Sequence, residues 1–432
     1  MASGIPLPRR RRFARQRPDT RGVPRGGARR RMIRDFLPAL PPVLSHAAVF
    51  GALVIVGLLA GEAVRRYASL PRITGYAVAG AVLGPQGVNL LTDNMLFDLR
   101  ILVDLSVGLI VFELGFRLDL KWLRLNRWLL ATAVAESAFC FWSIFGALVY
   151  FDFRPVLAAM AAAIGTATSP AVVMLVASDL RAEGQITERM LLFTAVNSVF
   201  AYVLLTLLLP FLHLEHKATW EQALFHPLYL LCGSIFAGYL ACLLMLRLAA
   251  WLGKREELQF VLLVAMVIVT VGVAHALKLS VSLTLITLGI LARNLDHEHA
   301  LLPVHFGYGA QLFFVILFVL VGASLEFSAF NAVAATVVAA YIVVRFLGKG
   351  LALLLFGPLS GIRPGGAGLL TIALLPLSGS AVVMVRDTTS LYPAFGKELA
   401  AVVLSAVVIL ELIGPLATQF ALRRAGEARP NG

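Results

Sequence analysis

Long apolar segments alternate with short charged loops along the chain from residue 42 onward. A helix needs about 20 apolar residues to cross roughly 30 Å of bilayer hydrocarbon, and most of these segments have about that length. The pattern therefore predicts an all-α polytopic membrane protein with about thirteen transmembrane helices. The expected spans are residues 43–63, 72–90, 99–116, 128–149, 154–178, 189–212, 226–250, 257–277, 279–293, 308–325, 329–356, 365–385 and 398–421.

These spans define a transmembrane domain at 42–422, followed by a short cytoplasmic tail at 423–432. The composition agrees, because 59% of the residues are hydrophobic and only 14% are charged, whereas soluble domains average about 25% charged residues. No Gly-rich phosphate loop, nucleotide-binding fingerprint or hydrolase motif occurs. Cys140, Cys232 and Cys242 lie within apolar spans and lack metal-ligand spacing. We therefore expect no enzyme activity, no cofactor and no bound metal.

Most of the net charge of +13 belongs to the first residues of the chain. Residues 1–31 contain eleven arginines and one acidic residue, Asp19. Because residues 1–41 are rich in Pro, Gly and Arg, they cannot build a core. We expect this tail either to be disordered or not to be part of the translated protein. The alternative is an arm that binds nucleic acid or anionic lipid. We favour a disordered or untranslated tail and expect no nucleic-acid partner.

The remaining basic residues predict the orientation of the spans. Loops that follow odd-numbered spans carry most of them, as in the loop with Arg117, Lys121, Arg124 and Arg127. The positive-inside rule then places these loops and the C-terminus in the cytoplasm of a cell whose inner membrane holds the protein. The spans at 154–178 and 365–385 therefore run in opposite directions.

These two antiparallel spans contain nearly the same sequence, "TSPAVVMLV" at 168–176 and "SGSAVVMVR" at 378–386. Pro170 removes a backbone donor from the first span, and Pro376 does so in the second, so both helices should unwind near these positions. Inverted repeats with helices broken near the membrane midplane are typical of secondary transporters. The alternative is two ordinary proline kinks with Ser and Thr packing across helices.

Exposed carbonyls and hydroxyls at such breaks can hold a cation. The following span adds two neutral hydrogen-bonding side chains in "AVNSVF" that can bind a cation but cannot release a proton. The candidate cation-binding residues are Thr168, Ser169, Asn197, Ser198, Ser378 and Ser380.

Charged side chains deep in a span are costly and are candidates for function. Arg345 and Lys349 are one turn apart in "VVRFLGKGLALLLF", so they share a helix face and require an anionic or carbonyl partner. Glu113, Glu136 and Glu411 are the carboxylates that look buried within apolar spans, and Glu136 is the most central. We therefore assign charge coupling to Arg345, Lys349 and Glu136, although each of these could instead be a paired structural residue.

Several segments together resemble the monovalent cation:proton antiporter superfamily, in particular its Kef-like branch. The segments are "ITGYAVAGAVLGP", "DLSVGLIVFELGFRLDLKWL", "LKLSVSLTLITLGILARN", "FFVILFVLVGASLEFS" and "VVRFLGKGLALLLFG". The resemblance covers about residues 50–420. It implies inverted repeats, a homodimer and elevator-type alternating access, and it matches Arg345 or Lys349 to the family's buried basic position.

The resemblance also exposes a difference in the coupling chemistry. The family carries one or two acidic residues where this chain has Asn197 and Ser198, and some members have Asp where it has Ser169. The expected function is antiport of Na⁺ or K⁺ against protons, with the proton carried by Glu136 or Lys349. The alternatives are transport of a small organic anion or a non-transporting membrane sensor.

Overall fold

The computed structural model describes residues 46–215, 219–296, 301, 308–324, 332–377 and 379–429, which form helices and loops without a strand. The predicted tail at 1–41 and Ser378 lie outside these residues. From Val49 onward the helices belong to one unit, separate from the unit formed by residues 1–48. The elements are α2 (His46–Ala63), η1 (Val64–Ala68), α3 (Arg72–Leu83), α4 (Asp93–Asp98), α5 (Arg100–Phe116), α6 (Leu120–Leu125), α7 (Arg127–Tyr150), α8 (Pro155–Thr166), α9 (Pro170–Asp179), α10 (Gln185–Glu215), α11 (Trp220–Leu252), α12 (Glu256–Ala276), α13 (Val281–Leu295), α14 (Tyr308–Ala323), α15 (Ala332–Phe356), η3 (Gly357–Ser360), α16 (Pro364–Ala373), α17 (Gly379–Leu391) and α18 (Pro393–Arg424).

The predicted all-helical membrane architecture is confirmed. Each of the thirteen predicted segments contains a helix. Among the described residues, eight spans are long and apolar enough to cross a membrane by themselves, and four further apolar helices are shorter. The number thirteen therefore stays a prediction. The short elements α4, α6, η1 and η3 were not predicted, because fewer than seven residues are too short for a periodic signal.

Helix boundaries follow local chemistry. Proline occupies the first turn of α8, α9, α16 and α18, where its missing N–H costs no hydrogen bond. Asp119 caps α6 by accepting hydrogen bonds from the backbone N–H groups of Lys121 and Trp122 at 2.9 and 3.0 Å. Ser280 caps α13 in the same way, accepting from Leu283 N at 3.4 Å.

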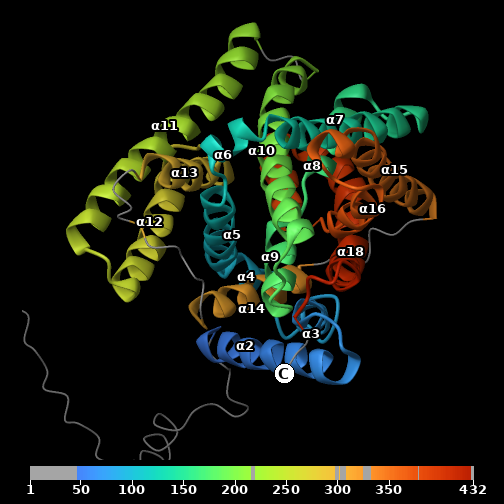
Figure 1. Ribbon diagram of the computed structural model, residues 1–432. Helices are drawn as coiled ribbons and strands as arrows, with labels where there is room; N and C mark the ends of the chain where they lie inside the picture. Colours follow the sequence, from blue (N-terminus) through green and yellow to red (C-terminus); the bar gives the residue numbers. More distant parts are fainter. Residues whose placement is uncertain are drawn as a thin grey trace, which may run out of the picture. The chain divides into compact units, whose positions relative to one another are not determined.

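The helix contacts repeat under an exchange of the two halves of the chain. α5 packs against α13, α3 packs against α14, and α7 packs against α15, although the partners are far apart in sequence (Figure 1). α10 packs on α8 and α9, as α18 packs on α16 and α17. Exchanging α3 with α13, α5 with α14, α7 with α15, α8 and α9 with α16 and α17, and α10 with α18 therefore maps these contacts onto one another. This is the pattern of an inverted repeat.

Glycines make the closest helix contacts, and they follow the same exchange. Gly80 is the ninth residue of α3 and Gly289 is the ninth residue of α13. A Cβ atom on Gly80 would collide with the backbone carbonyl of Val319 in α14, and one on Gly289 would collide with that of Phe112 in α5. Small residues allow such approach between membrane helices. Both equivalent helix pairs are thus packed backbone against backbone.

The residues after α18 are tied to the start of α10. α18 ends at Arg424, two residues beyond the predicted end of the domain. The carboxylate of Glu427 accepts hydrogen bonds from Ile186 N at 2.8 Å, from Thr187 N at 2.7 Å and from the Thr187 hydroxyl at 2.8 Å. Glu427 therefore satisfies the free N–H groups at the start of α10, which a local capping residue would otherwise do.

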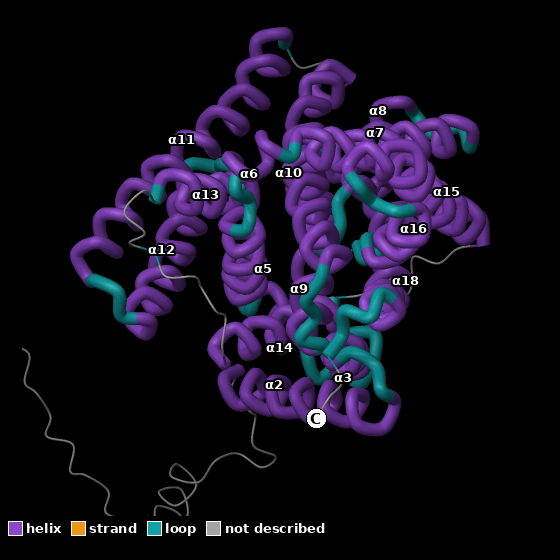
Figure 2. Tube along the Cα trace, viewed as in Figure 1, coloured by secondary structure: helices purple, strands orange, loops and turns teal. Residues whose placement is uncertain are grey.

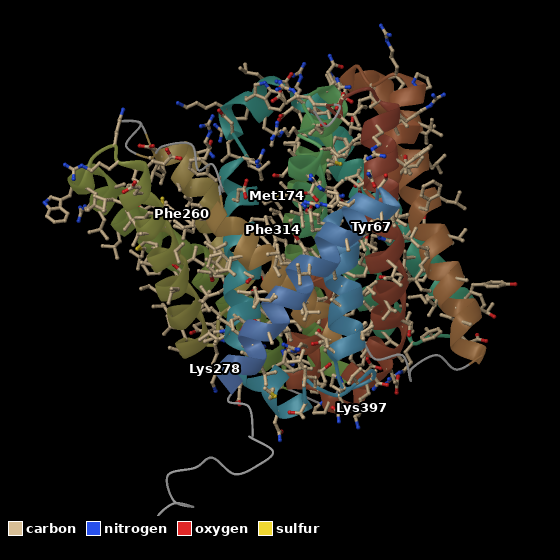
Figure 3. All side chains as sticks on the ribbon, turned by 90° about the horizontal axis from the view of Figure 1, so that it is seen from below. Tyr67, Met174, Phe260, Lys278, Phe314 and Lys397 are labelled. Atoms are coloured by element: carbon tan, nitrogen blue, oxygen red, sulfur yellow. The ribbon has the colours of Figure 1, made fainter. Side chains whose placement is uncertain are left out.

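Two loops that the charge pattern predicts on the same side of the membrane contain Lys278 and Lys397. Lys278, after α12, and Lys397, near the start of α18, both lie toward the lower edge of Figure 3, with Met174 of α9 nearer the middle. The orientation of these loops in the membrane stays a prediction.

Candidate functional site

Two interrupted helices meet inside the protein. α8 ends at Thr166 and α9 begins at Pro170, while α16 ends at Ala373 and α17 begins at Gly379 (Figure 2). The backbone N–H of Ser169 donates to the carbonyl of Pro376 at 3.0 Å, so the two interruptions are in direct contact. The hydroxyl of Ser169 caps α9 by accepting from Val172 N at 3.4 Å. Both breaks occur where the sequence predicts them.

Arg345 of α15 binds carbonyl oxygens from both interruptions. Its Nε donates to Gly165 O at 2.8 Å and its Nη2 to Ala167 O at 2.7 Å, both at the first break. Its Nη1 donates to Leu375 O at 2.7 Å at the second break, and longer bonds of 3.4 Å reach Leu374 O and Pro376 O. The side chain is fully buried. The guanidinium therefore replaces the helical hydrogen bonds that both carbonyl sets have lost.

Lys349, one turn further along α15, forms a buried ion pair with Glu136 of α7. Its Nζ donates to Glu136 Oε1 at 2.7 Å, to Thr166 O at 3.1 Å and to Thr168 Oγ1 at 3.2 Å. The Lys349 side chain is 1% exposed and that of Glu136 is 0% exposed. Since an ammonium has three N–H donors, all of them are used. The pair brings one positive and one negative charge into the interior without net charge.

The second oxygen of this carboxylate, Glu136 Oε2, is buried and has no hydrogen-bond partner among the described residues. The hydroxyl of Ser380 in α17 is also buried and has no hydrogen-bond partner among the described residues. An unsatisfied buried acceptor costs about 1–3 kcal/mol, and more when it is charged. Glu136 therefore retains the capacity to accept a proton or to bind a cation.

Asn197 of α10 connects the ion pair to the neighbouring helix. Its Nδ2 donates to Thr168 Oγ1 at 3.3 Å, and its Oδ1 accepts from the Ser137 hydroxyl at 2.7 Å. The adjacent Ser198 donates instead to Thr194 O in its own helix at 2.8 Å. All of these side chains are buried. Neutral hydrogen-bonding groups thus occupy the position on α10 beside the ion pair.

The structure brings four of the predicted site residues into one hydrogen-bonded network: Glu136, Lys349, Thr168 and Asn197. Arg345 joins them through the carbonyls of the two breaks. Ser169 N bonds to Pro376 O of the second break, and the Ser169 hydroxyl accepts from Val172 N. The Ser198 hydroxyl bonds to Thr194 O within α10. Ser378 lies outside the described residues.

Two members of the network were not among the predicted residues. Ser137 directly follows Glu136, and Thr166 contributes its carbonyl at the end of α8. Adjacency to a central carboxylate is the signal that could have indicated Ser137. Glu113 pairs instead with Arg117, directly after α5, at 2.8 Å. No cluster of three or more His, Cys, Asp or Glu that could hold a metal occurs in the described part of the chain.

These features define a polytopic helical membrane protein built from inverted repeats, with two interrupted helices in contact and a buried ion pair beside them. A family model described as "Sodium/hydrogen exchanger, transmembrane" matches residues 50–424. The chain therefore belongs to this family, which confirms the resemblance to monovalent cation:proton antiporters seen in the sequence. No curated protein matches the chain.

Solved structures of the sodium proton antiporter MjNhaP1 from Methanocaldococcus jannaschii have a similar fold. The structure at pH 8 has a TM-score of 0.64 at 15% identity, over 88% of this chain and 95% of that one. A structure from an electron-microscopy map has a TM-score of 0.66 at 14% identity, over 88% of this chain and 98% of that one. At such low identity the likeness establishes the fold alone.

Proposed function

We propose that the protein is a secondary transporter that exchanges a monovalent cation, Na⁺ or K⁺, for a proton by alternating access. Membership of the sodium/hydrogen exchanger family supports this function. The observation that carries it is the buried pair of Lys349 and Glu136, which contacts the first interruption through Thr166 and Thr168. Thr168 Oγ1 in turn donates to Leu374 O of the second interruption at 3.4 Å. We further propose that the exchanger occupies 42–422, lies in the inner membrane and acts as a homodimer.

The charge of the buried site supports coupling between cation and proton. A cation that enters beside the intact ion pair would add one positive charge to the interior, which costs several kcal/mol. If the cation binds the Glu136 carboxylate while Lys349 loses a proton from Nζ, the total charge of the site does not change. One cation is then bound for each proton released, and return of the proton to Lys349 restores the pair and expels the cation.

The predicted ligands have separate roles in this proposal. Glu136 supplies the charge, and Thr168 Oγ1, Asn197 Oδ1 and the carbonyl of Thr166 supply neutral oxygens around it. Ser169, Ser198, Ser378 and Ser380 belong to the same breaks or to α10 and are proposed as further ligands. Arg345 keeps the two interruptions together throughout the cycle, because it binds carbonyls of both.

The contacts of the two basic residues speak against an organic anion as the substrate. All three donors of Lys349 are occupied, and Arg345 makes five hydrogen bonds to backbone carbonyls. An entering anion would have to displace these bonds within a fully buried site. A cation instead meets the unsatisfied Oε2 of Glu136.

The test is collapse of a preformed pH gradient in proteoliposomes. Addition of Na⁺, K⁺ or Li⁺ should dissipate the gradient with the wild-type protein and leave it intact in protein-free liposomes. The cation that acts at the lowest concentration identifies the substrate. A gradient that persists with all three cations and collapses with a small carboxylate would overturn the proposal in favour of anion transport.

A second test changes Ser198, which the resemblance matches to an acidic position of the family. The substitution Ser198→Asp places a carboxylate on α10 beside the pair, and we expect it to alter the apparent cation affinity. Cation-driven proton flux that is the same in Ser198→Asp and in the wild type would argue against a cation pathway at this position.

A further inference from the structure

A short basic and aromatic segment connects α5 to α7. It comprises residues 121–128, "KWLRLNRW", in which Lys121, Arg124 and Arg127 alternate with Trp122, Leu125 and Trp128. We call these six residues the α6 patch. The three apolar members are exposed, by 48% for Trp122, 84% for Leu125 and 52% for Trp128. The neighbouring Leu123 and Leu129 are buried instead and anchor the segment.

The basic members of the α6 patch are exposed and lack protein counter-charges. Lys121, Arg124 and Arg127 form no ion pair among the described residues, whereas Arg117 pairs with Glu113 at 2.8 Å and Arg293 pairs with Asp119 at 3.7 Å. Three uncompensated cations within seven residues attract an anion. Because they form no ion pair among the described residues, these charges do not stabilise the fold through salt bridges.

A cavity of about 960 Å³ opens beside the patch. Four patch residues line it: Trp122, Leu125, Arg127 and Trp128. Arg189 of α10 and Arg293 of α13 line it as well. Arg189 donates to the carbonyls of Ser360 and Gly361 at 3.4 and 3.5 Å. The acidic residues in the lining are Asp119, which caps α6, and Glu188. The lining therefore carries more positive than negative charge.

The position of the patch indicates what kind of anion it fits. α6 lies directly between α5 and α7, so the patch stands where spanning helices leave the hydrocarbon and meet the aqueous phase. Tryptophan is enriched at this level because its ring is apolar and its N–H is polar. A segment that combines Lys and Arg with Trp and Leu is typical of contact with anionic lipid at the membrane surface. Binding of a soluble anion would not explain the three exposed apolar side chains.

We infer that the α6 patch binds the headgroup of an anionic phospholipid from the adjacent leaflet. Lys121, Arg124 and Arg127 bind the phosphate, and Trp122, Leu125 and Trp128 contact the glycerol and the upper acyl chain. The cavity lined by Arg189 and Arg293 accommodates the rest of the headgroup. The charge pattern assigns this leaflet to the cytoplasmic side.

The test measures binding to the full-length protein in detergent. The probes are short-chain phosphatidylglycerol, phosphatidylcholine with the same chains, and inorganic phosphate, and the readout is the rise in melting temperature with probe concentration. The variant Lys121→Gln/Arg124→Gln/Arg127→Gln removes three charges. Each basic residue near an anionic surface contributes roughly fivefold in affinity, so the variant should bind phosphatidylglycerol on the order of 100-fold more weakly.

The matched control is Lys254→Gln/Arg255→Gln/Arg424→Gln, which removes the same charge from exposed positions of other cytoplasmic segments. It should bind phosphatidylglycerol like the wild type. Equal weakening in both variants would show general charge attraction and overturn the site. Equal stabilisation of the wild type by phosphatidylcholine or by inorganic phosphate would overturn the anionic lipid as its occupant.

A second measurement does not depend on the stability of a charge variant. Brominated phosphatidylglycerol should quench the tryptophan fluorescence of the wild type, and Trp122→Phe/Trp128→Phe should lose most of this quenching. Quenching that is unchanged in the double variant would place the lipid elsewhere. Both readouts measure lipid binding, so their outcome is independent of whether the protein exchanges cations for protons.

Discussion

Replacing Glu136 by glutamine removes the negative half of the buried pair and leaves the ammonium of Lys349 without a counter-charge. The two side chains are 0% and 1% exposed, so water cannot compensate for the loss. Glutamine keeps one acceptor near Lys349 Nζ, and the bonds to Thr166 O and Thr168 Oγ1 at 3.1 and 3.2 Å remain. The variant therefore isolates the charge of Glu136 from its shape.

Removing one partner of a buried ion pair costs about 3–5 kcal/mol, because the other charge stays buried and uncompensated. Since three donors of Lys349 keep acceptors, we place the cost of Glu136→Gln at about 3 kcal/mol, the lower end of that range. Adding Lys349→Met removes the orphaned charge. The double variant should recover to within about 1 kcal/mol of the wild type, as replaced buried pairs often do.

The assay combines unfolding in detergent with exchange in proteoliposomes. We expect Glu136→Gln to be destabilised and inactive, and the double variant to be stable and equally inactive, because neither retains the proton and cation site. Glu62→Gln is the control, since Glu62 forms partly exposed pairs with Arg66 at 2.7 Å and Arg72 at 3.2 Å that contribute about 1 kcal/mol each. A double variant that exchanges cations for protons at the wild-type rate would refute the reasoning.

Three further predictions concern the breaks, α10 and the helix contacts. Arg345→Lys should lose the bridge between the two breaks, since one ammonium cannot replace a fork with three bonds of 2.7–2.8 Å; it should lower stability by about 3 kcal/mol or more, seen as a reduced melting temperature. Asn197→Ala should weaken apparent cation affinity about fivefold, because loss of one hydrogen-bonding ligand is worth about 1 kcal/mol; an unchanged concentration dependence of exchange would exclude Asn197 as a ligand. Gly80→Ala should destabilise the protein by about 1–3 kcal/mol through a collision with the Val319 carbonyl, whereas Gly146→Ala, with open space around it, should not lower the melting temperature.

The helix breaks could be predicted from the sequence because their cause is local. Pro170 and Pro376 remove a backbone donor wherever they stand in a helix, and the interruptions occur beside them. The shared face of Arg345 and Lys349 follows from helical periodicity in the same way. Both residues reach the first break, Arg345 at Ala167 O and Lys349 at Thr166 O.

The partners of these charges could not be predicted from the sequence. Glu136 and Lys349 are 213 residues apart, and helical periodicity does not show which of several central carboxylates meets a given lysine. Ser198 shows a second reason, because a serine within a helix often bonds to the carbonyl four residues earlier, and this one does so to Thr194. A hydroxyl at a suggestive position can thus be occupied by its own helix.

Proton release on cation binding tests the central claim most directly. Purified wild-type protein in weakly buffered detergent should acidify the solution when Na⁺ or K⁺ is added, with one proton released for each cation bound, and choline chloride should have no such effect. Glu136→Gln/Lys349→Met should neither bind the cation nor release a proton. Cation binding without proton release in the wild type, or equal release from the double variant, would contradict coupling at the Lys349–Glu136 pair.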